Sequence, residues 1–188
     1  MQHADQGGRV RAGERFQEPA FVPPAEGIAR LRETIAILKN MWTRDVFDFD
    51  GEYYTLTGTR NRPRPVQPGG PPLLIGAWGS RALRVVAEQA DIWNIPGPPH
   101  NSLDLVRERA RVLDAHCADI GRDPDTLTRS VQYIVSYDDP ATDRKTVAEL
   151  VDAGLTHIVL SLRGPYPPGV ARWLVDEIIT PVRETVAS

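Results

Sequence analysis

From Leu73 onward the sequence alternates short apolar runs with longer amphipathic segments, and this alternation limits the possible folds more than any other feature. The apolar runs cover residues 73–77, 91–95, 130–136 and 157–162. Each run is followed by apolar residues at helical three–four spacing. Nearly continuous runs of Ile, Val and Leu are typical of strands buried on both faces, as in parallel sheets. The sequence therefore predicts four right-handed βα units in an α/β layer or barrel.

The amino-terminal part of the chain follows a different pattern. Residues 1–24 have no apolar period, and we expect an irregular leader. Ile28, Leu31, Ile35, Leu38 and Trp42 predict one amphipathic helix. Two aromatic-rich runs within 46–56 flank Asp50-Gly51, which predicts a hairpin with a tight turn of positive φ. A proline-rich connector, 62–72, then leads to the first βα unit.

Composition excludes several functional classes. The chain has 188 residues and a formal net charge of −3, which gives no electrostatic support for binding nucleic acid. The single cysteine, Cys117, excludes a disulfide framework and a cysteine-based zinc site. No apolar run approaches the ~18 residues of a membrane helix, and the first 15 residues hold no signal-peptide core. These features lead us to expect a cytoplasmic protein that binds neither membrane nor nucleic acid.

Candidate site residues follow from the architecture, because ligands of parallel α/β folds gather at the carboxyl ends of the strands. The turn 76–81 offers Gly76 and Gly79 for close approach of a ligand, and Ser80 as a helix cap. The same turn is equally consistent with a strand–helix junction that binds nothing. It matches neither nucleotide-binding fingerprint, since GxGxxG and GxxxxGK[ST] are both absent.

Two further loops place polar side chains at the same end. Residues 94–100 bring Asn94 and His100 to the mouth of the sheet, with a solvent-exposed loop histidine as the alternative interpretation of His100. Arg163 leaves the last strand where it could meet a phosphate or carboxylate, although an exposed or structural arginine is an equal contender. Residues 138–142 predict an acidic helix cap without a ligand.

Other candidates fail on position or spacing. His157 precedes its strand and is therefore expected at the opposite end of the sheet. No HExxH, paired His/Asp spacing or GxSxG is present, so the sequence supports neither a metal site nor an acyl-transfer nucleophile. The sequence identifies no catalytic residue.

Several segments, in this order, resemble the bacterial luciferase-like monooxygenase superfamily. They are the helix 28–42, the hairpin 47–54, Arg64-Pro-Val-Gln-Pro68, Pro72-Leu-Leu-Ile-Gly-Ala77, Ala90-Asp-Ile-Trp-Asn94 and Ile179-Thr-Pro-Val-Arg183. The resemblance implies a (β/α)8 barrel that uses reduced FMN or the deazaflavin F420 to oxidise or reduce a small organic substrate. It also implies cofactor contacts at Gly76, Ala77, Gly79, Ser80 and Asn94, whereas Trp78 departs from the small residue common at its position.

The resemblance covers residues 25–188 and only the carboxy-terminal half of the family's barrel. Since a (β/α)8 barrel takes about 250 residues, we expect a half barrel of four βα units plus a β-hairpin excursion, incomplete as a catalyst. Its open edges predict a homo-oligomer or a complementing chain. One alternative is a non-catalytic half barrel that dimerises or serves as an interaction module. A third hypothesis is that the chain is a phosphate-binding α/β domain that uses the turn 76–80.

Overall fold

A computed structural model of the chain describes residues 22–186, so most of the expected leader 1–24 lies outside the described residues. Four parallel strands form one sheet in the sequential order β3-β4-β5-β6. They are β3 (Leu74–Gly76), β4 (Ile92–Ile95), β5 (Thr128–Ile134) and β6 (His157–Ser161). The four predicted strands are confirmed, with ends that differ by one or two residues.

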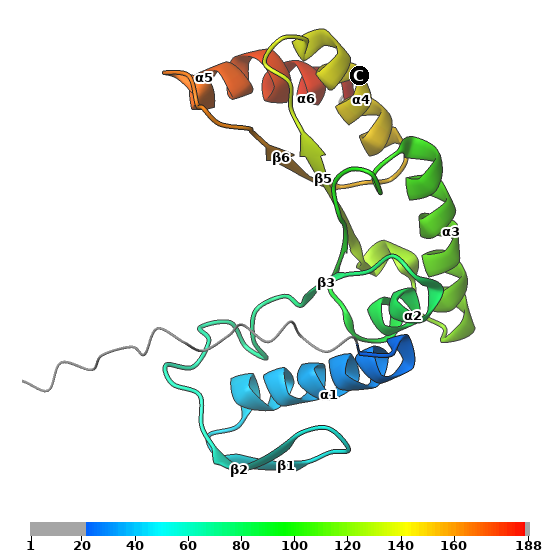
Figure 1. Cartoon of the computed structure of the whole chain (residues 1–188), viewed down its shortest axis with the longest axis vertical. Coiled ribbons are helices and arrows are strands. Elements are labelled where there is room, and N and C mark those ends of the chain that lie inside the picture. Colours follow the sequence, from blue (N-terminus) through cyan, green and yellow to red (C-terminus); the bar gives the residue numbers. More distant parts are fainter. Residues whose placement is uncertain (1–21, 187–188) are drawn as a thin grey trace, which may run out of the picture.

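Helices cover one face of this sheet (Figure 1). They are α2 (Ser80–Gln89), α3 (Leu103–Asp119), α4 (Pro140–Asp152) and a last helix made of α5 (Val170–Leu174), the π-helical η2 (Val175–Ile179) and α6 (Thr180–Val186). A short 3-10 turn, η1 (Pro124–Thr126), precedes β5. Each strand is thus followed by its helix, as the alternation predicts.

The hydrophobic core lies between the sheet and these helices. Trp93, Ile95 and Val131 of the sheet are fully buried. Leu83, Val86 and Ala87 of α2 are also fully buried, at the three–four spacing that gives a helix one apolar face. The helix ends follow the sequence signals: Gly121 and Gly154 take positive φ, and Asp139 Oδ1 accepts a hydrogen bond from Thr142 N at 3.0 Å.

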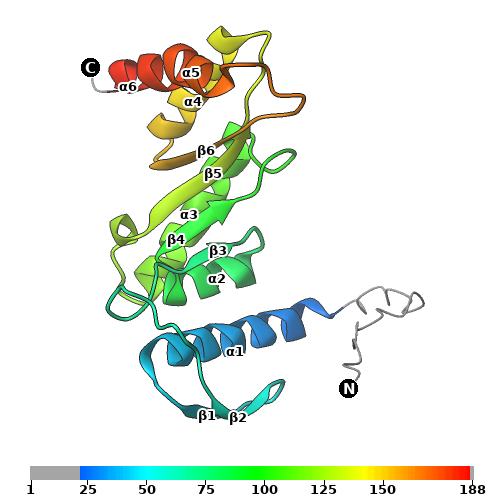
Figure 2. The same cartoon turned by 90° about the vertical axis from the view of Figure 1, so that its left-hand side faces the viewer.

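Helix α1 (Pro24–Thr43) packs beside α2, and the hairpin of β1 (Phe47–Asp50) and β2 (Thr55–Thr59) lies against α1 at one end of the molecule (Figure 2). The prediction of a tight turn at Asp50-Gly51 is wrong, because residues 51–54 form the loop between the two strands and Gly51 has no positive φ. Glu33 of α1 accepts hydrogen bonds from the backbone N–H groups of Glu52, Tyr53 and Tyr54. Its carboxylate therefore adds to the loop's own backbone hydrogen bond, which runs from Gly51 N to Tyr54 O at 2.9 Å.

The sheet does not close into a barrel. Within residues 22–186, β3 and β6 each have one strand neighbour and one free edge. The α/β class with a parallel sheet is confirmed, while the half barrel stays a prediction. No helix among these residues is long and apolar enough to span a membrane.

Candidate functional site

One row of residues crosses all four strands in direct register. Gly76 of β3 pairs with Asn94 of β4, Asn94 with Ser130 of β5, and Ser130 with His157 of β6. Residues that pair directly in a parallel sheet point to the same face. The row therefore gathers one glycine and three polar side chains on one side of the sheet.

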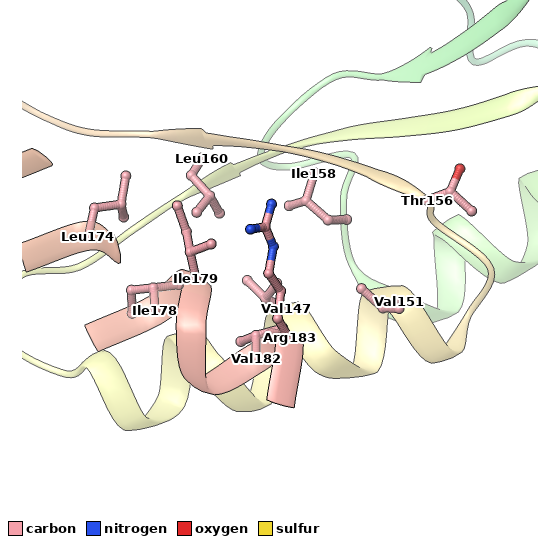
Figure 3. Close-up of a pocket in the computed structure, with 10 residues that line it drawn as sticks. All are labelled: Val147, Val151, Thr156, Ile158, Leu160, Leu174, Ile178, Ile179, Val182 and Arg183. Carbon is pink, nitrogen blue, oxygen red and sulfur yellow. The ribbon is translucent and has the colours of Figure 1, made fainter. Parts of the chain in front are cut away.

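That side is the one without helices. Figure 3 shows Ile158 and Leu160 of β6 pointing from the strand toward α4 and the last helix. Because side chains alternate along a strand, His157 and Val159 point the opposite way. Leu74 and Val159 are 48% and 40% exposed, which confirms that this side lacks a cover within the described residues. We call this side the bare face; it carries Leu74, Gly76, Asn94, Ser130, Gln132, His157, Val159 and Ser161.

The turn that follows β3 is fixed by its neighbours. Ala77 N donates to Asn94 O at 3.3 Å, and Ala77 O accepts from the buried Trp93 Nε1 at 3.0 Å. A Cβ added at Gly76 or Gly79 would contact nothing within 4 Å, and neither residue has a positive φ. Neither packing nor backbone conformation requires glycine there, so both glycines leave space beside a rigid turn.

Ser80 does not cap α2. It is the first helical residue, Gly79 holds the cap position, and no side chain bonds the free N–H groups. The Ser80 hydroxyl instead lies 3.1 Å from His116 Nε2 of α3. The sequence-based capping role is therefore wrong, because α3 supplies a partner that the local sequence does not reveal.

The loop after β4 folds onto the turn after β3. The His100 ring packs on Trp78 with centroids 5.1 Å apart, and the Arg109 guanidinium lies 5.3 Å from the Trp78 ring. Trp78 thus serves as a packing surface for His100 and Arg109. The structure brings together the two loops that the sequence analysis singled out.

Arg163 lies apart from that cluster. It lines a separate hollow of about 450 Å³ with Tyr137, Tyr166 and neighbouring loop residues. Tyr137 donates its hydroxyl to Arg163 O at 2.9 Å, which fixes the backbone of this loop. The structure therefore does not join Arg163 to the row that contains Gly76 and Asn94.

Sequence reasoning missed Ser130 and His157. Ser130 is fully buried. Its Oγ lies 3.1 Å from Asn94 Oδ1 and 2.9 Å from His157 Nδ1. His157 does begin β6, as expected, but the register of the strands brings it into the row of Gly76 and Asn94. The position of His157 along its own strand therefore does not separate it from that row. Neither residue stands out in the sequence, because Ser130 is one of several polar residues of β5 and His157 is the first residue of β6.

Besides the hollow at Arg163, an apolar groove of about 410 Å³ lies on the opposite side of the sheet from the bare face (Figure 3). Aliphatic side chains of α4, β6 and the last helix line it, and Arg183 extends into it. It contains none of the candidate residues and no group that could act as an acid or base near neutral pH. Within the described residues, no cluster of three or more His, Cys, Asp or Glu could hold a metal ion.

Comparison with known proteins identifies the family of this chain. A family model described as luciferase-like monooxygenase matches residues 8–167. The chain belongs to the luciferase-like monooxygenase family. This family membership confirms the resemblance carried by the ordered motifs.

Three proteins illustrate what the chain is similar to. A Mycobacterium tuberculosis protein of uncharacterised function is 32% identical over 149 residues, which are 79% of this chain and 47% of that protein. The F420-dependent glucose-6-phosphate dehydrogenase of Nocardia farcinica is 32% identical over 129 residues, or 69% of this chain and 37% of that enzyme. The structure of an F420-dependent secondary alcohol dehydrogenase superposes with a TM-score of 0.70 at 12% identity, covering 86% of this chain and 63% of that one. The chain therefore spans about half the length of the first of these proteins and 37% of the second.

Proposed function

We propose that this luciferase-like chain forms one wall of a cofactor site in an oxidoreductase that acts on a small organic substrate. The observation that carries the proposal is the open space beside Gly76 and Gly79, on a turn held rigid by Asn94 and Trp93. A side chain at either glycine would occupy that space, so the two glycines fit a ring or chain lying along the turn.

We propose F420 as the cofactor, with FMN as the alternative. The support is that both the Nocardia farcinica relative and the solved alcohol dehydrogenase are named F420-dependent. Such a cofactor supplies hydride transfer, and the protein supplies binding, orientation and exclusion of water. In this chain, Gly76 and Gly79 would leave room for the cofactor, Ser80 and Asn94 would offer hydrogen-bonding groups, and Ala77, whose N–H and C=O are already bonded, would lie against the cofactor. His100 and Arg163 remain candidates for contacts with the substrate.

The proposal includes a complement for the bare face. Free edges on β3 and β6 are sites where further strands can pair. Relatives that extend well beyond the matched region support the idea that such strands belong to the active protein. We propose that strands from additional polypeptide pair with both edges and cover the bare face, which would complete a barrel around the cofactor.

Fluorescence titration with F420, and separately with FMN, tests the cofactor site. The chain is measured alone and together with a polypeptide containing the part of the Nocardia farcinica enzyme that this chain leaves uncovered. We expect saturable one-to-one binding that is lost in Gly76→Val and Gly79→Val, because the added side chains fill the space beside the turn. Gly27→Val is the matched control, since a Cβ there also contacts nothing but lies on α1.

Binding unaffected by Gly76→Val and Gly79→Val would contradict the site. Failure of both cofactors to bind in both preparations would contradict the function. A stable dimer of the chain that binds neither cofactor would instead support the non-catalytic interaction module, for which the free strand edges are the motivating observation.

A further inference from the structure

The buried hydroxyl of Ser130 has two polar partners and a single proton to share. Its Oγ lies 3.1 Å from Asn94 Oδ1, an oxygen that can only accept a hydrogen bond. It also lies 2.9 Å from His157 Nδ1, a nitrogen that donates or accepts according to the tautomer. Since a buried serine without partners is costly, both contacts count as hydrogen bonds that hold the group.

The number of available protons determines the tautomer of His157. The Ser130 hydroxyl donates its proton to Asn94 Oδ1, so the contact with His157 must use a proton on Nδ1. A neutral imidazole carries one N–H, which leaves Nε2 as an unprotonated acceptor. His157 is exposed on the bare face, so its ring remains accessible from that side.

We propose that His157 is a ligand-binding residue that presents Nε2 to the bare face as an acceptor for a hydroxyl group of a bound small molecule. The donor is either a hydroxyl of the cofactor's own side chain or the hydroxyl of an alcohol substrate. Asn94 and Ser130 act through His157 by fixing its tautomer and orientation. This inference rests on the proposed function, because it assumes that the bare face contacts the ligand.

A second histidine provides an internal reference, because we expect it to adopt the opposite tautomer. His116 Nε2 lies 3.1 Å from both the carbonyl oxygen and the hydroxyl of Ser80; the carbonyl can only accept and the hydroxyl can also accept, so a proton on Nε2 of His116 satisfies both contacts. The two side chains are therefore expected to show opposite tautomers in one protein. Nitrogen-15 chemical shifts of the ring separate protonated from unprotonated nitrogens, so a single spectrum reads both.

The first arm measures ring nitrogen-15 shifts in the 188-residue chain at about pH 8. His157→Gln assigns the signals. We expect an unprotonated Nε2 for His157 and a protonated Nε2 for His116. Ser130→Ala should release the His157 tautomer and leave that of His116 unchanged. A protonated Nε2 on His157 would overturn the proposal, since it would mean that Ser130 donates to His157 and that the Asn94 amide is reversed.

The second arm adds F420 alone, then F420 with propan-2-ol, to the preparation that binds the cofactor. A shift of His157 Nε2 with F420 alone assigns the cofactor hydroxyl as donor, and a shift only with propan-2-ol assigns the alcohol. In His157→Phe, which lacks an acceptor, we expect the affinity for that molecule to fall about three- to tenfold, the effect of one lost neutral hydrogen bond. Lys145→Gln, on the exposed surface of α4, is the control and should bind normally.

The two arms separate the possible failures. Binding of F420 and propan-2-ol that leaves the His157 signal unchanged, with the same affinity in His157→Phe as in the wild type, overturns this inference and leaves the proposed function intact. Absence of any cofactor binding overturns the proposed function and, with it, the ligand role of His157. The tautomer measured in the first arm then reports only on the Ser130 hydrogen bonds.

Discussion

Asp143 shows how much one buried side chain settles at the carboxyl end of the sheet. It is 3% exposed, accepts the Tyr133 hydroxyl at 2.7 Å and accepts the backbone N–H of Ser136 at 2.8 Å. A buried carboxylate is tolerated when hydrogen-bond donors surround it. Asp143 therefore joins the end of β5 to the first turn of α4 and fixes the course of the loop between them.

Replacing Asp143 with asparagine should destabilise the fold. The amide keeps one acceptor oxygen for Ser136 N and turns an N–H₂ group toward Tyr133, whose hydroxyl must then accept instead of donate, so two charge-assisted hydrogen bonds become weaker neutral ones. We expect Asp143→Asn to lower the free energy of unfolding by about 1–3 kcal/mol, measured by urea denaturation. Asp139→Asn is the control and should change stability little, because asparagine also caps a helix. Equal stability of Asp143→Asn and the wild type would contradict this role.

Tyr133 predicts a loss of stability at alkaline pH. Burial, followed by the hydrogen bond to Asp143, raises the pKa of Tyr133 from 10.0 to about 12. Folding thus favours the neutral phenol, and the resulting stabilisation is complete below about pH 10 and disappears as the pH rises toward 12. Absorbance titration near 295 nm should show a last tyrosine ionisation that is absent from Tyr133→Phe. If Tyr133→Phe retains that step, the assignment is wrong.

At the scale of elements, the hairpin depends on a contact from outside its own sequence. The Glu33 carboxylate sits where a side chain at residue 51 would lie, and a Cβ on Gly51 would overlap it. We expect Gly51→Ala to cost about 1–3 kcal/mol in thermal or urea unfolding, because the carboxylate or the loop must move. Gly27→Ala, in open space on α1, should be neutral or slightly stabilising. A Gly51→Ala variant as stable as Gly27→Ala would show that Glu33 does not hold the loop.

Elements could be predicted from the sequence wherever the signal is local. The period of Leu83, Val86 and Ala87 reports the buried face of α2, and Gly121 and Gly154 mark helix ends through their positive φ. The turn at Gly51 could not be predicted in this way, because Glu33, 18 residues earlier, determines its form. For the same reason the partner of Ser80 escaped prediction, since His116 reaches it from a different helix.

At the scale of the whole molecule, the register of the sheet decides which residues share a site. Asn94 and the turn 76–80 could be proposed from strand ends alone, and the structure brings them together through the bond from Ala77 N to Asn94 O. Ser130 and His157 could not, because their places depend on how far each strand is shifted against the next. That shift is a property of the assembled sheet. Membership of the luciferase-like family, in contrast, could be predicted from the order of several short motifs.

The bare face is where the account of this protein can be tested most directly. Amide chemical shifts of the isotopically labelled chain, with the complementing polypeptide present, should be mapped on addition of F420. We predict that the largest changes fall on residues 76–80 and on Asn94, Ser130 and His157. Changes confined to the apolar groove around Val151 and Arg183, or no changes from either F420 or FMN, would contradict the claim that the bare face forms the wall of a cofactor site.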